Sequence, residues 1–336
     1  MLITLTAIVL ALLLDQWLGE TRRYHPLVGF GRLANALEKK LNRAVAIADN
    51  SRLPRNWGAL ELLHSIFSLT LTRRERGLLA LLCMVGAPLL GALLLCNYLA
   101  LAWWPLQVCG QAVILYVAIG RQSLREHALA VANALQRNDI VVARRAVSRI
   151  VTRDTERADA ATVSSAAVET VLENGSDALF ASLFWFIVAG LPGAVVHRAA
   201  NTLDAMWGYR TERFNEFGWA AARFDDLLNY IPARLTAVAY ALSGQTQRAL
   251  HCWRTQAPLW SSPNAGPVMA AGAGALGLQL GGAAIYNGVV EIRPPLGSGR
   301  AAQPGDIRRA LHLLDRSLAI WLGVLVLFAG AMHWLI

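Results

Sequence analysis

Residues 77–120 form a continuous stretch without a single charged side chain. A helix needs about 20 predominantly apolar residues to cross the hydrocarbon core of a bilayer, so this stretch has room for two crossings. Trp103, Trp104 and Pro105 lie near its middle, where aromatic residues and a proline favour a turn at the membrane interface. The sequence therefore predicts a helical hairpin in a membrane, with spans near 77–98 and 102–120.

The rest of the chain supports a membrane protein. Hydrophobic residues make up 55% and charged residues 16%, whereas soluble domains have about 25% charged residues. Further apolar segments occupy residues 2–18, 178–197 and 317–336. Gly190 and Pro192 interrupt the second of these, which is either a full span or a broken, re-entrant segment. We expect an all-α, polytopic integral membrane protein forming one domain over 1–336, with about four to six membrane segments and amphipathic cytoplasmic helices.

The formal net charge is +9, and its distribution is informative. All Lys and Arg residues fall into four blocks, at 22–76, 121–157, 198–254 and 293–316. Such alternation is typical of loops between membrane spans, and basic loops favour the cytoplasm. Both middle blocks can be cytoplasmic only if 178–197 is not a lone crossing. There is no continuous basic stripe, so we expect no nucleic-acid partner.

Two familiar ligand motifs are absent or unconvincing. The only lysines, Lys39 and Lys40, do not follow the glycines of a P-loop, so any nucleotide must be held by arginines, backbone N–H groups and metal. Residues 265–286 contain a Gly-x-Gly-x-x-Gly match, but no β-branched strand precedes it, and we reject a dinucleotide fold. Gly277 and Gly281 instead have the spacing of a closely packed membrane helix. The scattered cysteines and histidines do not predict a zinc site.

Three carboxylates in the polar centre, residues 121–234, are spaced by four. Glu169, Glu173 and Asp177 would share one face of a helix, unless Gly175 ends that helix early. No Lys or Arg occurs between Arg157 and Arg198, so pairing within the helix cannot neutralise them. Carboxylates next to apolar sequence are costly unless they bind a cation or a distant arginine. We therefore expect contact with Mg²⁺ or with substrate.

Other polar groups recur at helical spacings in this centre. Asn201 and Asp204 are three residues apart, and a further group consists of Arg223, Asp225, Asp226, Asn229 and Arg234. An ion-paired surface helix is the alternative for that further group, and a helix cap is the alternative for Arg153-Asp154-Thr155. Taken together, oxygen ligands suited to Mg²⁺ and arginines suited to phosphate suggest phosphate chemistry.

Long motifs in this centre resemble one family. They are Arg153-Asp154-Thr155, VETVLENGSD at 168–177, NTLDAMWGYR at 201–210 and FGWAAARFDDLLNYIPAR at 217–234. His25-Pro26 with Gly31-Arg32, and PNAG at 263–266, also match. The chain resembles the adenosylcobinamide-phosphate synthases of cobalamin (vitamin B12) biosynthesis over nearly its whole length. It departs from that pattern at Glu20-Thr21 and at Val268.

The resemblance implies a multi-pass enzyme of the cell inner membrane with its active site facing the cytoplasm. Such an enzyme joins adenosylcobyric acid, a corrinoid, to (R)-1-amino-2-propanol phosphate, or to free aminopropanol, through a new amide. ATP and Mg²⁺ are the expected cofactors. The lipid bilayer is an expected partner, and contacts with other late cobalamin-pathway membrane enzymes are compatible with this role.

Carried over onto this chain, the motifs imply candidate site residues. The candidate catalytic residues are Glu169, Glu173, Asp177, Asp204, Asp225 and Asp226, with Glu173 and Asp204 as Mg²⁺ ligands. The candidate substrate- and phosphate-binding residues are His25, Arg32, Arg153, Asp154, Thr155, Asn174, Asn201, Arg210, Arg223, Asn229, Arg234 and Asn264. The alternatives are a signalling or regulatory relative without ligase activity and a transporter. The intact polar motifs argue against the first, and the lack of internal repeats argues against the second.

Overall fold

The computed structural model describes residues 1–19, 25–42, 71–286 and 288–334. Helices account for about 76% of these described residues. The prediction of an all-α protein is therefore largely confirmed but needs one correction, because a small sheet is also present.

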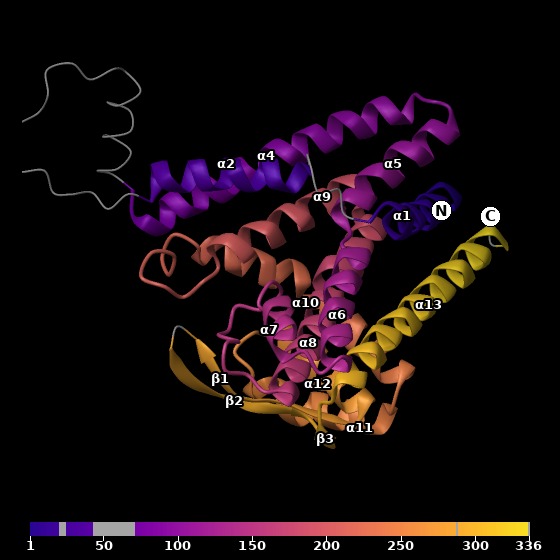
Figure 1. Cartoon of the computed structure of the whole chain (residues 1–336). Coiled ribbons are helices and arrows are strands. Elements are labelled where there is room, and N and C mark those ends of the chain that lie inside the picture. Colours follow the sequence, from indigo (N-terminus) through magenta and orange to yellow (C-terminus); the bar gives the residue numbers. More distant parts are fainter. Residues whose placement is uncertain (20–24, 43–70, 287, 335–336) are drawn as a thin grey trace, which may run out of the picture.

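One group of helices lies side by side along the upper part of Figure 1. It consists of α1 (Leu2–Leu18), α2 (Pro26–Leu41), α4 (Arg73–Ala100), α5 (Trp104–Ala118) and α9 (Ser182–Trp207). α4 packs against α9 and α1 packs against α5. The turn between α4 and α5 falls at the predicted Trp103-Trp104-Pro105 run, since Pro105 supplies the preset φ of a first helical turn.

The second group lies below it and holds most of the polar centre (Figure 1). It consists of α6 (Arg121–Gln136), α7 (Ile140–Val147), α8 (Ala160–Gly175), α10 (Trp219–Ser243), α11 (Thr246–Gln256), the 3₁₀ turn η2 (Ala257–Leu259), α12 (Ala265–Leu276) and α13 (Pro304–Trp334). A continuous hydrophobic core joins these helices to α1 and α5, and a second core lies between α2, α4, α9 and α10.

Three helical stretches of the described chain are long and apolar enough to cross a membrane, namely Arg73–Ala100, Ala160–Trp207 and Pro304–Ala331. The first contains the predicted span at 77–98. The last covers 317–331 of the predicted span at 317–336, whose final residues 335–336 lie outside the described part of the chain. Helices also form at the other predicted segments, but α1 has 17 residues and α5 has 15, which is shorter than the roughly 20 that a perpendicular crossing needs. The apolar helices indicate a membrane protein.

The helical path from α8 into α9 is continuous but irregular. Gly175 does not stop the helix; it has α-helical dihedrals, and a π-helical turn, η1 (Ser176–Ala181), follows directly. Such turns widen the helix and occur frequently at functional sites. Further on, Gly190 adopts φ 64°, which breaks α9 just before Pro192. The segment 178–197 is therefore helical with a break at Gly190, as the interruption by Gly190 and Pro192 suggested.

Residues 278–301 form the sheet that the sequence analysis missed. β1 (Leu278–Tyr286) pairs with β2 (Val289–Gly297) in an antiparallel hairpin, and β3 (Arg300–Ala301) adds a short parallel strand on the other side of β1. The predicted helix with Gly277 and Gly281 on one face is wrong. Gly277 takes the left-handed conformation that ends α12, and Gly281, with φ 79°, lies at a shift in the β1–β2 register.

Candidate functional site

A cavity of about 1090 Å³ lies where the two groups of helices meet the hairpin. Its volume is at the upper end of what ligand sites usually offer. α6, α8, η1, α9, the loop before α8 and strand β2 all contribute to its walls, as do residues after η2. Segments that are far apart in the sequence therefore converge on one polar space.

The structure brings eight of the candidate residues to this cavity. They are His25, Arg153, Glu169, Glu173, Asn174, Asp177, Asn201 and Asp204. The other candidates are not part of its lining. They are Arg32, Asp154, Thr155, Arg210, Arg223, Asp225, Asp226, Asn229, Arg234 and Asn264.

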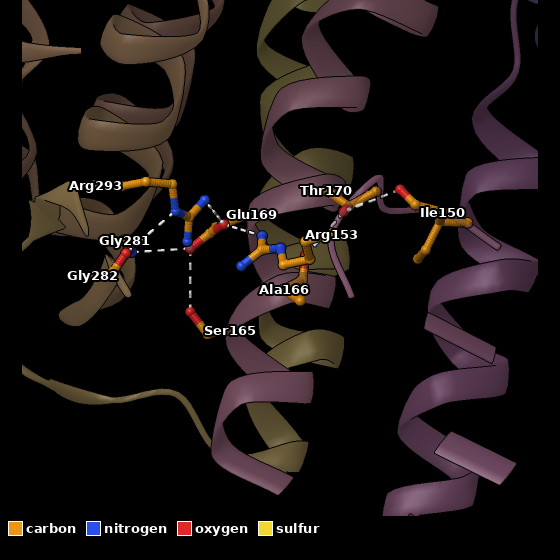
Figure 2. A network of polar contacts seen from close by, with 9 residues as sticks. All are labelled: Ile150, Arg153, Ser165, Ala166, Glu169, Thr170, Gly281, Gly282 and Arg293. Carbon is orange, nitrogen blue, oxygen red and sulfur yellow. Dashed lines mark hydrogen bonds and ion pairs between the residues drawn. The ribbon is translucent and has the colours of Figure 1, made fainter. Parts of the chain in front are cut away.

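Glu169 is the centre of a dense polar network at one wall (Figure 2). Its carboxylate pairs with Arg153 and with Arg293, whose Nη1 lies 2.9 Å from Oε2. It also accepts hydrogen bonds from the Gly281 N–H at 2.9 Å and from the Ser165 hydroxyl at 3.3 Å. Glu169 is only 2% exposed, so this carboxylate is fully engaged by protein groups. Through these contacts, Glu169 links α8 to the hairpin and to the loop that precedes α8.

Arg293 is a site residue that the sequence analysis missed. It lies on β2 and contributes to the cavity wall, and its guanidinium lies 5.6 Å from the ring centre of Trp260. Burial is the largest single influence and lowers the pKa of Arg293, but the charge and the hydrogen bonds of Glu169, with smaller contributions from Tyr286 and Glu173, together raise it above the usual value. Its partner is 124 residues away in sequence. The only available signal was the absence of local cations near Glu169, which pointed to a distant arginine.

Further acidic side chains gather deeper along α8, η1 and α9. Glu173, Asp177 and Asp204 all line the cavity, and Asp177 interacts electrostatically with the other two. Asp177 is carried by the π-helical turn. Gly208 makes room for Asp204, because a Cβ at this position would collide with the Asp204 carboxylate. Unlike Glu169, these three carboxylates have no ion pair of 4 Å or less with a described residue.

Two hydrogen-bonded pairs join α9 to α10 next to these carboxylates. His197 Nε2 lies 3.1 Å from Asn229 Oδ1. One turn later on α9 and one turn earlier on α10, Asn201 Nδ2 donates to Asp225 at 3.4 Å. Burial, followed by the charge of Asp204, raises the pKa of Asp225 to about 7. Asp225 therefore lies behind the cavity wall and influences it through Asn201 and Asp204.

The remaining candidates have structural contacts. Asp154 accepts from the Gly288 N–H at 2.8 Å and so anchors the hairpin turn, while Thr155 donates to the Arg144 carbonyl at 3.3 Å. Arg234 donates to Asn264 Oδ1 at 2.9 Å, and Asn264 donates to the Asp226 carbonyl at 2.8 Å. Three further arginines are exposed outside the cavity lining: Arg32, Arg210 and Arg223, the last of which pairs with Asp226 at 3.6 Å.

Within the described residues, no three His, Cys, Asp or Glu side chains are close enough to hold a metal ion unaided. Mg²⁺ commonly uses only one or two protein carboxylates and takes its other ligands from water and substrate phosphates. Glu173, Asp177 and Asp204 supply oxygen donors of this type without competing ion pairs. The donor set therefore fits an ion that arrives with a phosphorylated substrate.

Apolar helices around a large, charged internal cavity define a membrane protein built to handle a polar ligand. Residues 8–314 match the family described as CobD/Cbib protein. The chain belongs to this family, which confirms the resemblance drawn from the motifs.

Several relatives carry the name "Cobalamin biosynthesis protein CobD". That of Stutzerimonas stutzeri (strain A1501) is 54% identical over 328 residues, 97% of this chain and 98% of the relative. That of Chromobacterium violaceum is 49% identical, covering 96% and 97% of the two chains, and that of Mycobacterium tuberculosis (strain H37Rv) is 38% identical, covering 91% and 90%. No solved structure matches the chain.

Proposed function

We propose that this protein is an adenosylcobinamide-phosphate synthase of cobalamin biosynthesis. It would use ATP to join the carboxyl group of adenosylcobyric acid to the amine of (R)-1-amino-2-propanol phosphate, or of aminopropanol itself. The observation that carries this proposal is one cavity in which carboxylates that form no ion pair with a described residue lie near arginines, in a chain whose relatives are named for cobalamin biosynthesis.

The chemistry requires such a mixture of charges. A carboxylate does not react with an amine until one of its oxygens is converted into a better leaving group, and ATP is the reagent for that conversion. Planar, bidentate donors suit phosphate groups well, and arginine provides them. Arg153 and Arg149 line the cavity, and Glu169 holds Arg153 in place. A regulatory relative without ligase activity would have no use for this arrangement.

Glu173 and Asp204 are the residues that we propose to hold Mg²⁺, with Asp177 beside them. The ion would neutralise phosphate charge when bound. The residues of the chain then have three tasks. Arg153 would orient the phosphate, the carboxylates would hold the ion, and the cavity walls would limit access of water to the activated carboxyl group.

An assay with purified protein in detergent tests this proposal. Adenosylcobyric acid, the amino alcohol phosphate, ATP and Mg²⁺ are mixed, and the products are identified by mass spectrometry. We expect an amide product that forms only when all four components are present. Failure to form the amide, with folded protein and all components present, would refute the ligase function and favour a regulatory role.

Replacing Arg153 by Lys should weaken binding of the phosphorylated substrate. Lysine keeps the charge but loses the fork geometry, and each lost charge-assisted hydrogen bond is worth roughly 1.5–3 kcal/mol. This corresponds to a rise in apparent KM of about 10-fold or more, for the amino alcohol phosphate or for ATP. Arg223→Lys is the matched control, because Arg223 is exposed outside the cavity lining. Equal KM values in both variants would contradict a phosphate contact at Arg153.

We also propose that the protein lies in the cell inner membrane with the cavity open to the cytoplasm, where ATP is available. Single cysteines at Glu156 and Glu212, both exposed, test this orientation in a background with all native cysteines replaced. An impermeant thiol reagent should label neither position in intact cells and both in inverted vesicles. Labelling of position 212 in intact cells would place the loop after α9 outside the cytoplasm and contradict the proposed orientation.

A further inference from the structure

His127 lines the cavity from α6 and was not singled out by its sequence context. Its Nδ1 lies 2.8 Å from the backbone carbonyl oxygen of Ser123, one turn earlier on the same helix. A carbonyl oxygen can only accept a hydrogen bond, so Nδ1 must carry the proton. The second ring nitrogen, Nε2, is therefore the one with a lone pair whenever the ring is neutral. The helix backbone thus fixes both the orientation and the tautomer of this side chain.

The other histidine in the cavity lining has the opposite arrangement. His25 caps the start of α2, and its Nδ1 accepts a hydrogen bond from the Leu27 N–H at 3.2 Å. In the neutral ring of His25, the proton therefore resides on Nε2. His197, which is fully buried, is not in the lining, and its two ring nitrogens lie within hydrogen-bonding distance of Ser182 and Asn229. Among these three, only His127 combines a place in the cavity wall with a basic nitrogen.

We propose that His127 is the general base that deprotonates the incoming amine. This inference rests on the proposed amide synthesis. An alkyl amine is protonated at neutral pH, as lysine is, and an ammonium group has no lone pair with which to attack. Nε2 of His127 accepts one proton from the ammonium group and so generates the nucleophile. Histidine is the side chain that enzymes use most often for this transfer.

The following step balances without any additional reagent. The lone pair of the amine nitrogen forms the new C–N bond to the activated carboxyl carbon. The C–O bond to the ATP-derived leaving group breaks, and its electron pair departs with that group. The second proton lost by the nitrogen leaves on the departing phosphate. His127 then releases its proton to solvent before the next turnover.

Three of the acidic side chains in the cavity lining, Glu169, Glu173 and Asp204, are less suited to this task. Glu169 has both oxygens engaged by arginines and by a backbone N–H. Glu173 and Asp204 are the proposed Mg²⁺ ligands, and a carboxylate that binds a cation is a weaker base. His127 comes from α6, a helix that contributes none of these acids.

The test compares two amines in the variant His127→Ala. With the amino alcohol phosphate, we expect turnover at saturating substrate to fall by about 10²- to 10⁴-fold, the usual contribution of a general base. Hydroxylamine is largely unprotonated at neutral pH and needs no base to become a nucleophile. ATP-dependent hydroxamate formation should therefore stay within about threefold of the wild type. Added imidazole should partly restore amide formation.

His251→Ala is the matched control, because His251 is exposed on α11 and is absent from the cavity lining; both reactions should be unchanged. His127→Gln provides a second variant, since its amide can replace the hydrogen bond to Ser123 but has no basic nitrogen. Unchanged amide formation in either His127 variant would overturn the proposal. A parallel loss of both products would also overturn it, because it would show a structural role. Absence of amide formation in the wild type is a different result, which refutes the proposed function itself.

Discussion

Glu173→Gln and Asp204→Asn should each lower amide formation by at least about 100-fold. Both carboxylates line the cavity near other negative charges and have no ion pair with a described residue. An amide of the same shape removes the negative charge that would hold Mg²⁺ and, through the ion, the ATP phosphates. The loss of one well-placed electrostatic contact in an enclosed site commonly costs 10²- to 10³-fold in rate. The measurement is steady-state turnover with all substrates at saturation.

The same two substitutions should not destabilise the protein. Each removes one member of a group of like charges, so repulsion within the folded state decreases. We expect the thermal unfolding temperature in detergent, measured without ligands, to stay equal or to rise. Glu212→Gln, on the exposed loop after α9, controls for the loss of a charge elsewhere. Near-normal turnover in both cavity variants would show that these carboxylates take no part in the reaction.

Glu169→Gln, unlike the two substitutions above, should cause a large loss of stability. The substitution leaves Arg153 and Arg293, whose side chains are 9% and 13% exposed, facing each other without the charge that both of them bind. Breaking a buried ion pair by removing one partner typically costs about 3–5 kcal/mol. Because Glu169 also holds Gly281, the β1–β2 hairpin should loosen from α8 first. Limited proteolysis should then cut the chain near Gly288 much faster than in the wild type.

A double variant that removes Glu169 and one of its two arginine partners distinguishes a broken ion-pair network from a general packing defect. In Glu169→Gln with Arg293→Gln, the uncompensated charge is reduced, so the loss of stability should be smaller than the sum of the two single losses. Arg223→Gln serves as the control arginine, because its pair with Asp226 is exposed and contributes little. Strictly additive losses at Glu169 and Arg293 would contradict a shared network.

Local sequence signals predicted the helices well. α1 coincides with the predicted segment 2–18, and the aromatic turn before Pro105 divides α4 from α5 as expected. The spacing of Glu169, Glu173 and Asp177 did place all three in one cavity. The reason is that helix periodicity is a local property, and η1 keeps the chain helical beyond Gly175.

The errors arose where distant parts of the chain decide the structure. The hairpin was missed because its glycines resemble a helix-packing motif, whereas Gly277 and Gly281 take positive φ values that interrupt a helix. Arg293 could not be assigned to Glu169, since nothing local links residues 124 positions apart. Asp154 and Arg234 lie within the matching motifs, yet their side chains anchor the hairpin turn and the loop before α12. A motif therefore includes residues that shape the cavity as well as those that line it.

The most direct test of the account follows the oxygen atoms of the substrate carboxyl group. Adenosylcobyric acid labelled with ¹⁸O in its reacting carboxylate is incubated with the protein, ATP, Mg²⁺ and the amino alcohol phosphate. If ATP activates the carboxyl group in this cavity, one ¹⁸O atom must appear in an ATP-derived phosphate product for each amide formed. Glu173→Gln should abolish this transfer, and Glu212→Gln should not. Amide formation without any ¹⁸O in the phosphate products would contradict the account.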